Sequence, residues 1–186
     1  IGFASGTCLF TSKSVLDKIG LLDPFIFLYL DDLDLGWRAK QVGISSYFVP
    51  DSIVYHAESY ILKWSSKKFY WLERNRKYCL LTHYSKKTLL KILPSLIIVE
   101  ILVLFFYLSK GFIFAKLKAD IDILKNLSYI KKRYNELELK KTLDDKEIIK
   151  DFTDDVFVPK TVFKKSSIIF FEKIITKLSK RSRKGI

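Results

Sequence analysis

The chain has 186 residues, which is about the length of one domain. It carries 33 lysine and arginine residues against 20 aspartate and glutamate residues, a formal net charge of +13. Hydrophobic residues make up 49% of the chain, too many for a disordered basic tail, and two cysteines are too few for a disulfide scaffold. The sequence has no methionine, begins with Ile1 and shows no signal peptide there. We therefore expect it to be the C-terminal part of a longer protein.

Short elements are predicted in the first third of the chain, which is mixed in charge and rich in aromatic residues. Three apolar runs predict strands, at residues 7–10, 46–49 and 53–55. Ser12 is expected to cap a short helix that stops at Gly20. An acidic cluster then opens a second predicted helix, which ends near Gly43, and helical spacing predicts a third over 67–84.

An apolar run at 92–108 is interrupted only by Pro94, Ser95 and Glu100. As a helix its 17 residues span roughly 26 Å, slightly less than the hydrocarbon core of a bilayer. A charged glutamate near the middle is costly in lipid. Three interpretations stay open: a marginal transmembrane helix, a helix that lies in the membrane interface, and a buried core helix.

The C-terminal third is the most basic part of the chain. An amphipathic helix is predicted over 116–137, and 140–160 is charged and expected to be a loop or a weak helix. Residues 168–178 repeat apolar side chains at helical spacing, and residues 160–186 hold nine basic side chains against one acidic one. Such a helix favours an anionic membrane surface, although a solvated helix with a frayed basic tail fits equally well. Nucleic acid is a weaker interpretation, because no aromatic residues interleave with the basic cluster.

The acidic cluster Asp31, Asp32 and Asp34 is the most informative candidate for chemistry. A carboxylate at a helix N-terminus can act as a general base towards a substrate hydroxyl, and clustered carboxylates can hold a divalent cation. The structural alternatives are that Asp31 caps the helix and that Asp34 forms an i,i+4 pair with Arg38. Spacing alone does not decide between them.

His56 follows the last predicted strand and has no cysteine near enough in the sequence to build a zinc site with it. A lone histidine there is more often a packed or surface residue than a ligand. Cys8 and Cys79 are interpreted as small buried hydrophobic residues. Neither a glycine-rich phosphate loop nor a nucleophile elbow is visible in the sequence.

Five ordered blocks resemble the second half of a family 2 glycosyltransferase, most closely its rhamnosyltransferase-like branch. They are residues 3–10 (FASGTCLF), 15–23 (VLDKIGLLD), 27–38 (FLYLDDLDLGWR), 49–56 (VPDSIVYH) and 68–76 (KFYWLERNR). The resemblance covers about residues 1–90 and extends more loosely over the hydrophobic helices. It implies an α/β fold: the C-terminal portion of a GT-A, Rossmann-like domain over 1–87. Membrane-associated hydrophobic and amphipathic helices over 88–137 and a charged linker with a basic tail over 138–186 would follow.

The resemblance also implies roles for individual residues. The pair Asp31-Asp32 stands where the family usually has Glu-Asp, so Asp32 is the expected catalytic base of an inverting transfer and Asp31 its neighbour. His56 is the candidate to reach the metal or the diphosphate. The acceptor side is assigned to four residues, Ser5, Gly6, Asp34 and Arg38, with Arg38 either steadying Asp34 or approaching the diphosphate.

The implied partners are a nucleotide-sugar donor and an acceptor that is a saccharide or lipid-linked saccharide. A Mg²⁺ or Mn²⁺ ion would be bound mainly by the half that this chain lacks, so the chain is expected to be inactive alone. The apolar helix, the basic tail and the low cysteine content predict association with the cytoplasmic face of a membrane, and nucleic acid is not expected as a partner.

Two other functions are weighed against transfer of a sugar. One is a prenyl-diphosphate enzyme, which would need a second Asp-rich helix, and the pairs Asp144-Asp145 and Asp154-Asp155 lie in a weakly patterned region. The other is a non-catalytic basic module that binds a membrane or a nucleic acid.

Overall fold

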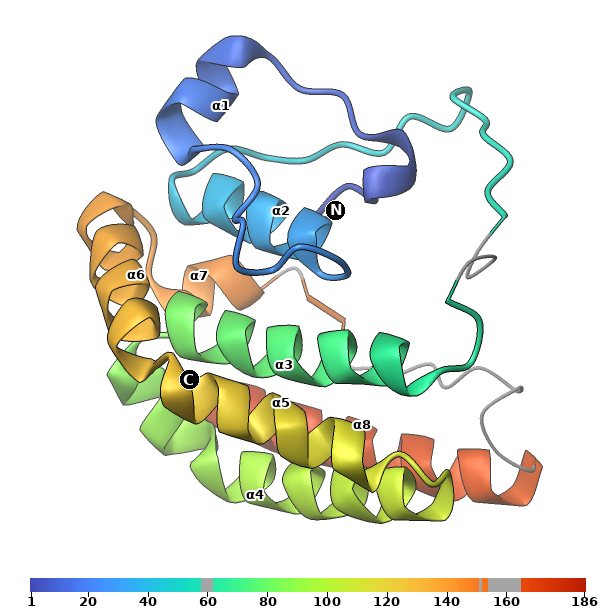
Figure 1. The fold of residues 1–186 in the computed structure, drawn as a ribbon. Helices are drawn as coiled ribbons and strands as arrows, with labels where there is room; N and C mark the ends of the chain where they lie inside the picture. Colours follow the sequence, from blue (N-terminus) through green and yellow to red (C-terminus); the bar gives the residue numbers. More distant parts are fainter. Residues whose placement is uncertain (58–61, 151, 154–164) are drawn as a thin grey trace.

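The computed structural model describes residues 1–57, 62–150, 152–153 and 165–186, with only the backbone of 165–171. Within these ranges the elements are a short 3₁₀ helix, η1 (Gly6–Cys8), and eight α-helices (Figure 1). The helices are α1 (Lys13–Ile19), α2 (Asp31–Gln41), α3 (Ser66–His83), α4 (Lys86–Ser109), α5 (Ile113–Lys125), α6 (Leu127–Lys140), α7 (Asp145–Ile149) and α8 (Lys165–Gly185).

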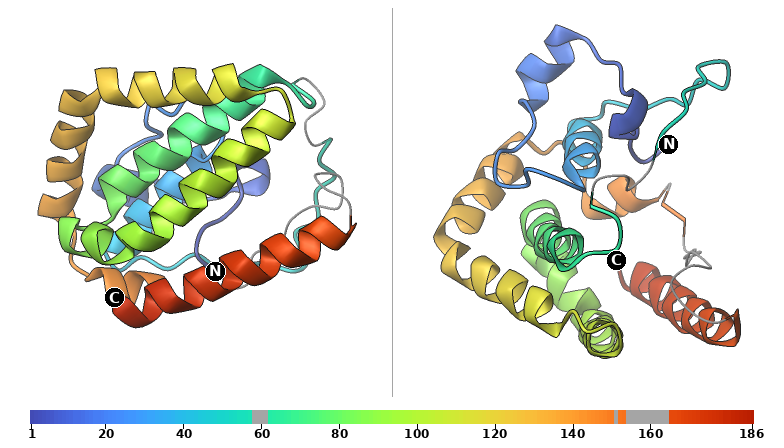
Figure 2. Two further views of the ribbon diagram at one scale, coloured as in Figure 1. Left: turned by 90° about the horizontal axis from the view of Figure 1, so that it is seen from below. Right: turned by 45° about the vertical axis from the view of Figure 1, so that its right-hand side comes forward.

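The helices are stacked in layers. Figure 1 shows η1, α1 and α2 on one side of α3, and α4, α5 and α8 on the other. Seen from below in Figure 2, α4 runs between α5 and α8, and it contacts both. Helix α3 packs against α5 and α6 and also touches α2, so it joins the first part of the chain to the last.

Side-chain caps explain where several helices begin. Ser12, Ser65 and Ser85 each accept a hydrogen bond from the backbone N–H three residues later, at the starts of α1, α3 and α4. Asp144 and Glu147 form a capping box at α7. Gly20 ends α1 with φ of 85°, a conformation that favours glycine. The predicted helices at 12–20, 31–43, 67–84, 92–108 and 168–178 are thus confirmed within one turn or as parts of longer helices.

The apolar core is divided into three clusters. The largest joins Ile26, Tyr78 and Cys79 to Ile123 and Ile130, so it holds the loop before α2 against α3, α5 and α6. A second joins Ile19 of α1 to Leu35 and Ala39 of α2. The third joins Phe69, Tyr107 and Ala115 of α3, α4 and α5.

The predicted α/β class is wrong for the described part of the chain, which contains helices and no strand or sheet. Residues 7 and 8 belong to η1, and 46–49 and 53–55 are irregular rather than paired strands. Their aromatic side chains are open to solvent, with Tyr47 82% and Tyr55 fully exposed. The strand prediction failed because β-propensity describes a residue packed in a sheet, and these runs have no neighbouring strand to pair with.

Two further details differ from the sequence predictions. The single helix expected over 116–137 is interrupted at Asn126, which separates α5 from α6. Cys8 is exposed, whereas Cys79 is buried as predicted, and burial raises the pKa of its thiol.

In 140–160 the structure places the short α7, while the pair Asp154-Asp155 lies outside the described residues. The division at 87 and 137 stays a prediction.

Helix α4 is long and apolar enough to cross a membrane, and among the described residues no other helix is. Only 6% of its most apolar stretch of 18 residues is buried, which disfavours the interpretation as a core helix. By length and composition α4 therefore suggests association with a membrane.

A charged cluster of six side chains holds α4 to its neighbours. Its members are Glu73, Arg76 and Lys77 of α3, Glu100 of α4, and Lys116 and Asp120 of α5. Lys116 lies 2.9 Å from Glu73, 3.0 Å from Glu100 and 3.3 Å from Asp120. Three acids thus face three bases, and the cluster is neutral overall. It explains how a glutamate is accommodated in the middle of an apolar helix.

Candidate functional site

Asp32 lies in the first turn of α2, where η1 reaches its carboxylate. The backbone N–H of Gly6 donates to Oδ2 at 2.9 Å, and the N–H of Leu33 donates to Oδ1 at 2.8 Å. Leu30, not Asp31, is the N-cap residue, and it makes no side-chain cap. Asp32 is partly exposed, so its carboxylate is held by two N–H groups and is still open to a substrate. A helix N-terminus also favours a negative charge at this place.

His56 contacts the same loop, residues 5–7, through Thr7. Its Nδ1 lies 3.3 Å from the hydroxyl oxygen of Thr7, and the Thr7 hydroxyl also accepts from Ser5 Oγ at 3.1 Å. Ser5 in turn accepts a hydrogen bond from the Thr7 N–H. Three consecutive residues of the loop therefore bring Asp32 and His56, 24 positions apart in the sequence, to one exposed place.

A close approach of the N-terminal segment to α2 sets the position of this loop. A Cβ atom added at Gly36 would lie 2.4 Å from Phe3 Cβ and 2.8 Å from Phe3 Cα. Gly36 is disfavoured within a helix by propensity alone. Its presence here lets the segment that leads to Ser5 and Gly6 rest directly on α2.

The loop before the acidic pair has an unusual backbone that α3 clamps. Phe27, Tyr29 and Leu30 have φ of 60°, 65° and 65°, which non-glycine residues rarely adopt. Asn75 is fully buried, and its Nδ2 donates to the carbonyl oxygens of Ile26, Leu28 and Tyr29 at 3.0, 2.7 and 2.9 Å.

Arg74 completes the clamp by donating to the carbonyls of Phe25 and Ile26. Its guanidinium also lies over the rings of Phe25 and Trp71. Strained backbone of this kind persists only where its surroundings hold it, and it is often found at functional sites.

Asp34 and Arg38 face inwards instead. Both are buried, and Arg38 donates to Asp34 Oδ2 through Nε and Nη2 at 2.9 and 2.7 Å. Burial by itself raises the pKa of Asp34, but the hydrogen bond and attraction of His83, and those of Arg38, hold it below its ordinary value. The predicted i,i+4 pair is confirmed, and its burial favours the steadying role of Arg38 over contact with an acceptor.

Arg38 also holds the end of α1, because it donates to the carbonyl of Ile19, the last residue of α1, and to those of Gly20 and Leu21 that follow. The two helices on either side of the loop are thereby fastened together. The prediction that Asp34 and Arg38 bind the acceptor stays a prediction, and nothing in their described contacts exposes them to one.

A groove of about 610 Å³ lies beside η1. Ser5, Thr7 and Cys8 line it from the loop, Leu35 and Gly36 from α2, and it continues along residues 44–54. Most of its lining is apolar. A second hollow, of about 400 Å³ and with a polar lining, lies at the start of α4, away from Asp32.

The predicted metal ion stays a prediction. In the described ranges no group of three or more His, Cys, Asp or Glu side chains converges as a metal site. His56 faces a hydroxyl, and both oxygens of Asp32 accept backbone N–H groups. We therefore derive no chemical step through a metal ion.

Three residues that shape the candidate site are not singled out by the sequence. Thr7 lies in a predicted strand, and Arg74 and Asn75 lie in the block 68–76 of a predicted helix. The adjacent pair Arg74-Asn75, polar side chains among the aromatics of 68–76, was the available signal. The sequence does not show which backbone carbonyls Arg74 and Asn75 bind.

Comparisons with known proteins bear on the same region. A family model described as "Glycosyltransferase like family 2" matches residues 2–79, which contain Asp32, His56 and the Asn75 clamp. The N-acetylglucosaminyl-diphospho-decaprenol L-rhamnosyltransferases of two Mycobacterium tuberculosis strains, CDC 1551 / Oshkosh and ATCC 25618 / H37Rv, are each 35% identical over 60 residues. That match covers 32% of this chain and 20% of each relative, and no solved structure matches. The resemblance to family 2 glycosyltransferases is thereby confirmed over residues 2–79, and the resemblance to rhamnosyltransferases over 60 residues of the chain.

Proposed function

We propose that this chain supplies the acceptor side and the general base of an inverting sugar transfer from a nucleotide-sugar. In the proposed step Asp32 takes the proton of an acceptor hydroxyl as that oxygen attacks the anomeric carbon. The bond to the nucleoside diphosphate breaks on the opposite face, and the diphosphate leaves with the electron pair. Asp31 and His56 flank the reacting groups.

The observation that carries the proposal is the position of the Asp32 carboxylate. Two N–H donors hold it at the exposed N-terminus of α2, next to the loop of Ser5 and Gly6 and to His56. A general base needs this combination of fixed geometry and access to substrate. The family match over 2–79 supplies the class of reaction.

The relatives' name suggests the partners. We propose a deoxyhexose donor of the rhamnose type and an acceptor saccharide carried on a prenyl diphosphate, presented at the cytoplasmic face of a membrane. The apolar surface of α4 supports an acceptor that is anchored in lipid. The proposed step is written for the residues of this chain alone, and no role for a metal ion is derived from them.

The test is Asp32→Asn in the longest natural protein that contains these residues. We expect sugar transfer to fall by about three orders of magnitude or more, since the amide cannot accept the proton at neutral pH. Binding of the nucleotide-sugar, measured by calorimetry, should remain. Transfer that continues at the original rate would rule out Asp32 as the base.

A matched control is Asp17→Asn. Asp17 is an exposed aspartate of α1 that pairs with Lys13 at the surface. The same chemical change there should leave transfer unaltered, because an exposed i,i+4 pair contributes little to stability.

A further inference from the structure

One face of α4 carries an uninterrupted apolar stripe. We define the α4 stripe as Leu90, Leu93, Ile97, Ile98, Ile101, Leu104, Phe105 and Leu108, all of them exposed. They recur every three or four residues, so they follow one side of the helix for about 27 Å. Between Leu93 and Leu108 every exposed position of α4 is apolar. Exposed apolar surface of this extent marks a site of contact with a partner or a membrane.

The neighbouring helix adds to this surface. Phe114, Leu117, Ile121 and Leu124 of α5 are exposed at the same helical spacing, and Phe114 is 81% exposed. The apolar residues of α8 are used differently, because Ile175 and Leu178 line a hollow together with Ile92 and Leu96 of α4. Five cations of α8 are exposed, Lys173, Lys177, Lys180, Arg181 and Lys184.

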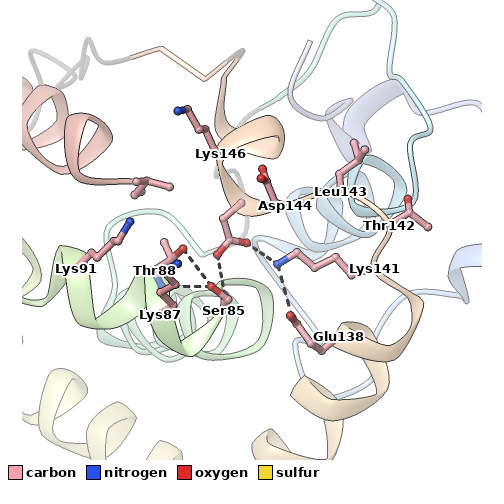
Figure 3. Close-up of a pocket in the computed structure, with 12 residues that line it drawn as sticks. Ser85, Lys87, Thr88, Lys91, Glu138, Lys141, Thr142, Leu143, Asp144 and Lys146 are labelled. Atoms are coloured by element: carbon pink, nitrogen blue, oxygen red, sulfur yellow. Dashed lines mark hydrogen bonds and ion pairs between the residues drawn. The ribbon is translucent and has the colours of Figure 1, made fainter.

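Positive charge lies at the N-terminal end of the stripe. Lys87 and Lys91 continue its helical spacing for one more turn, and with Lys146 of α7 they border the polar hollow of about 400 Å³ (Figure 3). The fourth lysine of that hollow, Lys141, is paired with Asp145 and Glu138. Figure 3 draws no such interaction for Lys87, Lys91 or Lys146. Cations next to an apolar face complement the surface of an anionic bilayer.

A charged group at the edge of the stripe argues against a spanning orientation. Glu100, near the middle of the helix, contacts Arg76, Lys77 and Lys116 in the charged cluster. If α4 crossed the bilayer, this cluster would enter the hydrocarbon together with α3, whose sequence is largely polar. If α4 lies parallel to the surface, the stripe faces the lipid while Glu100, at the edge of the stripe, keeps its partners on α3 and α5.

We infer that α4 lies in the plane of an anionic bilayer, with the α4 stripe buried in the interface and Lys87 and Lys91 at the headgroups. The inference goes beyond the proposed function, because it does not depend on transfer of a sugar. The candidate site around Asp32 then lies on the far side of α3 from the lipid (Figure 1).

Binding to vesicles tests the lipid contact. The purified 186-residue chain is sedimented with vesicles of phosphatidylcholine alone and of equal parts phosphatidylcholine and phosphatidylglycerol. We expect Ile97→Glu and Phe105→Glu each to lower partitioning by about tenfold or more, since each removes a large apolar side chain from the interface. Lys87→Glu with Lys91→Glu should weaken binding to the anionic vesicles and leave binding to the neutral ones unchanged.

The matched control is Leu139→Glu on α6. Leu139 is 88% exposed and lies outside the stripe, so its variant should bind like the original chain. Circular dichroism shows whether each variant keeps its helices. Folded stripe variants that bind as tightly as the original would overturn the inference. Absent vesicle binding, together with a dimer that the stripe variants dissociate, would assign the stripe to a second copy of the chain and overturn it as well.

Labelling of the two ends of α4 separates an interfacial helix from a spanning one. Lys87→Cys and Ser109→Cys are made singly in a Cys8→Ser background, where the remaining Cys79 is buried. Cells expressing the chain are broken to give sealed membrane vesicles, which are treated with a membrane-impermeant maleimide. Both positions should react from the same side. Reaction from opposite sides would show that α4 crosses the bilayer.

Discussion

Asp32 and Asp34 are two positions apart, yet their surroundings are opposite. Asp32 is partly exposed and accepts two backbone N–H groups, whereas Asp34 is fully buried between Arg38 and His83. By residue type and position in the acidic cluster alone, either aspartate could serve as a general base. The difference arises from the geometry of a helix, where a shift of two residues turns a side chain from one face to the other.

The sequence does not single out Asn75 as a residue that holds the loop, and its hydrogen bonds lead to a test. Asn75→Ala should lower the free energy of unfolding by roughly 1–3 kcal/mol, because one buried and two partly buried carbonyls would lose their shared donor group. Asn75→Asp should be worse, since an ionised carboxylate cannot donate to those carbonyls. Urea denaturation followed by circular dichroism measures both.

The control for Asn75 is Asn126→Ala at the junction of α5 and α6. The side-chain amide of Asn126 donates to the carbonyl of Asp122, and Asn126 is less buried, so the loss there should be smaller. If Asn75→Ala were as stable as the original chain, the loop of Phe27, Tyr29 and Leu30 would have to hold its left-handed backbone without the clamp.

At the scale of elements, helices could be predicted and strands could not. A helix closes its own hydrogen bonds, and a local signal such as Ser12 or Gly20 fixes its ends. A strand needs a partner elsewhere, so the apolar alternation of 46–55 could not establish a sheet. The break at Asn126 was also missed, since apolar spacing continues across it.

The charged cluster that joins α3, α4 and α5 is expected to contribute to the stability of the fold. Lys116 is buried, and although burial lowers the pKa of its ammonium, its hydrogen bonds and ion pairs with Glu73 and Glu100 raise it above its ordinary value. Lys116→Met should destabilise the fold by about 1–3 kcal/mol, because buried Glu73 would lose one of its three cationic partners and keep Arg76 and Lys77. Thermal and urea unfolding measure the loss.

Lys125→Met serves as the matched control on the same helix. Lys125 is exposed at the end of α5, so its replacement should change stability by less than about 0.5 kcal/mol. Equal effects of the two variants would mean that the cluster adds nothing specific to the packing of α4.

For the whole molecule, the sequence predicted the pieces of the site and not how they meet. Asp32, His56, Ser5 and Gly6 were identified by resemblance, and the structure places them around one loop. What joins them, the contact of Phe3 with Gly36, depends on packing between distant segments. The apolar run of α4 was visible in the sequence, but its division into an exposed stripe and a side that contacts α3, α5 and α8 required the neighbouring helices.

The buried acids set the pH dependence of the whole fold. Burial raises the pKa of Glu73 and Glu100, but arginine and lysine partners outweigh it, leaving Glu73 below its ordinary value and Glu100 at about 2; Asp34 is also lowered. Carboxyls lowered in the folded state stabilise it above their ordinary pKa and lose that effect as the pH falls towards the folded value. Stability should therefore be steady from about pH 8 to 5 and fall steeply between about pH 5 and 2, as urea unfolding at each pH would measure. Glu100→Gln should flatten this fall, whereas a chain that gained stability on acidification would show that these ion pairs do not hold the helices together.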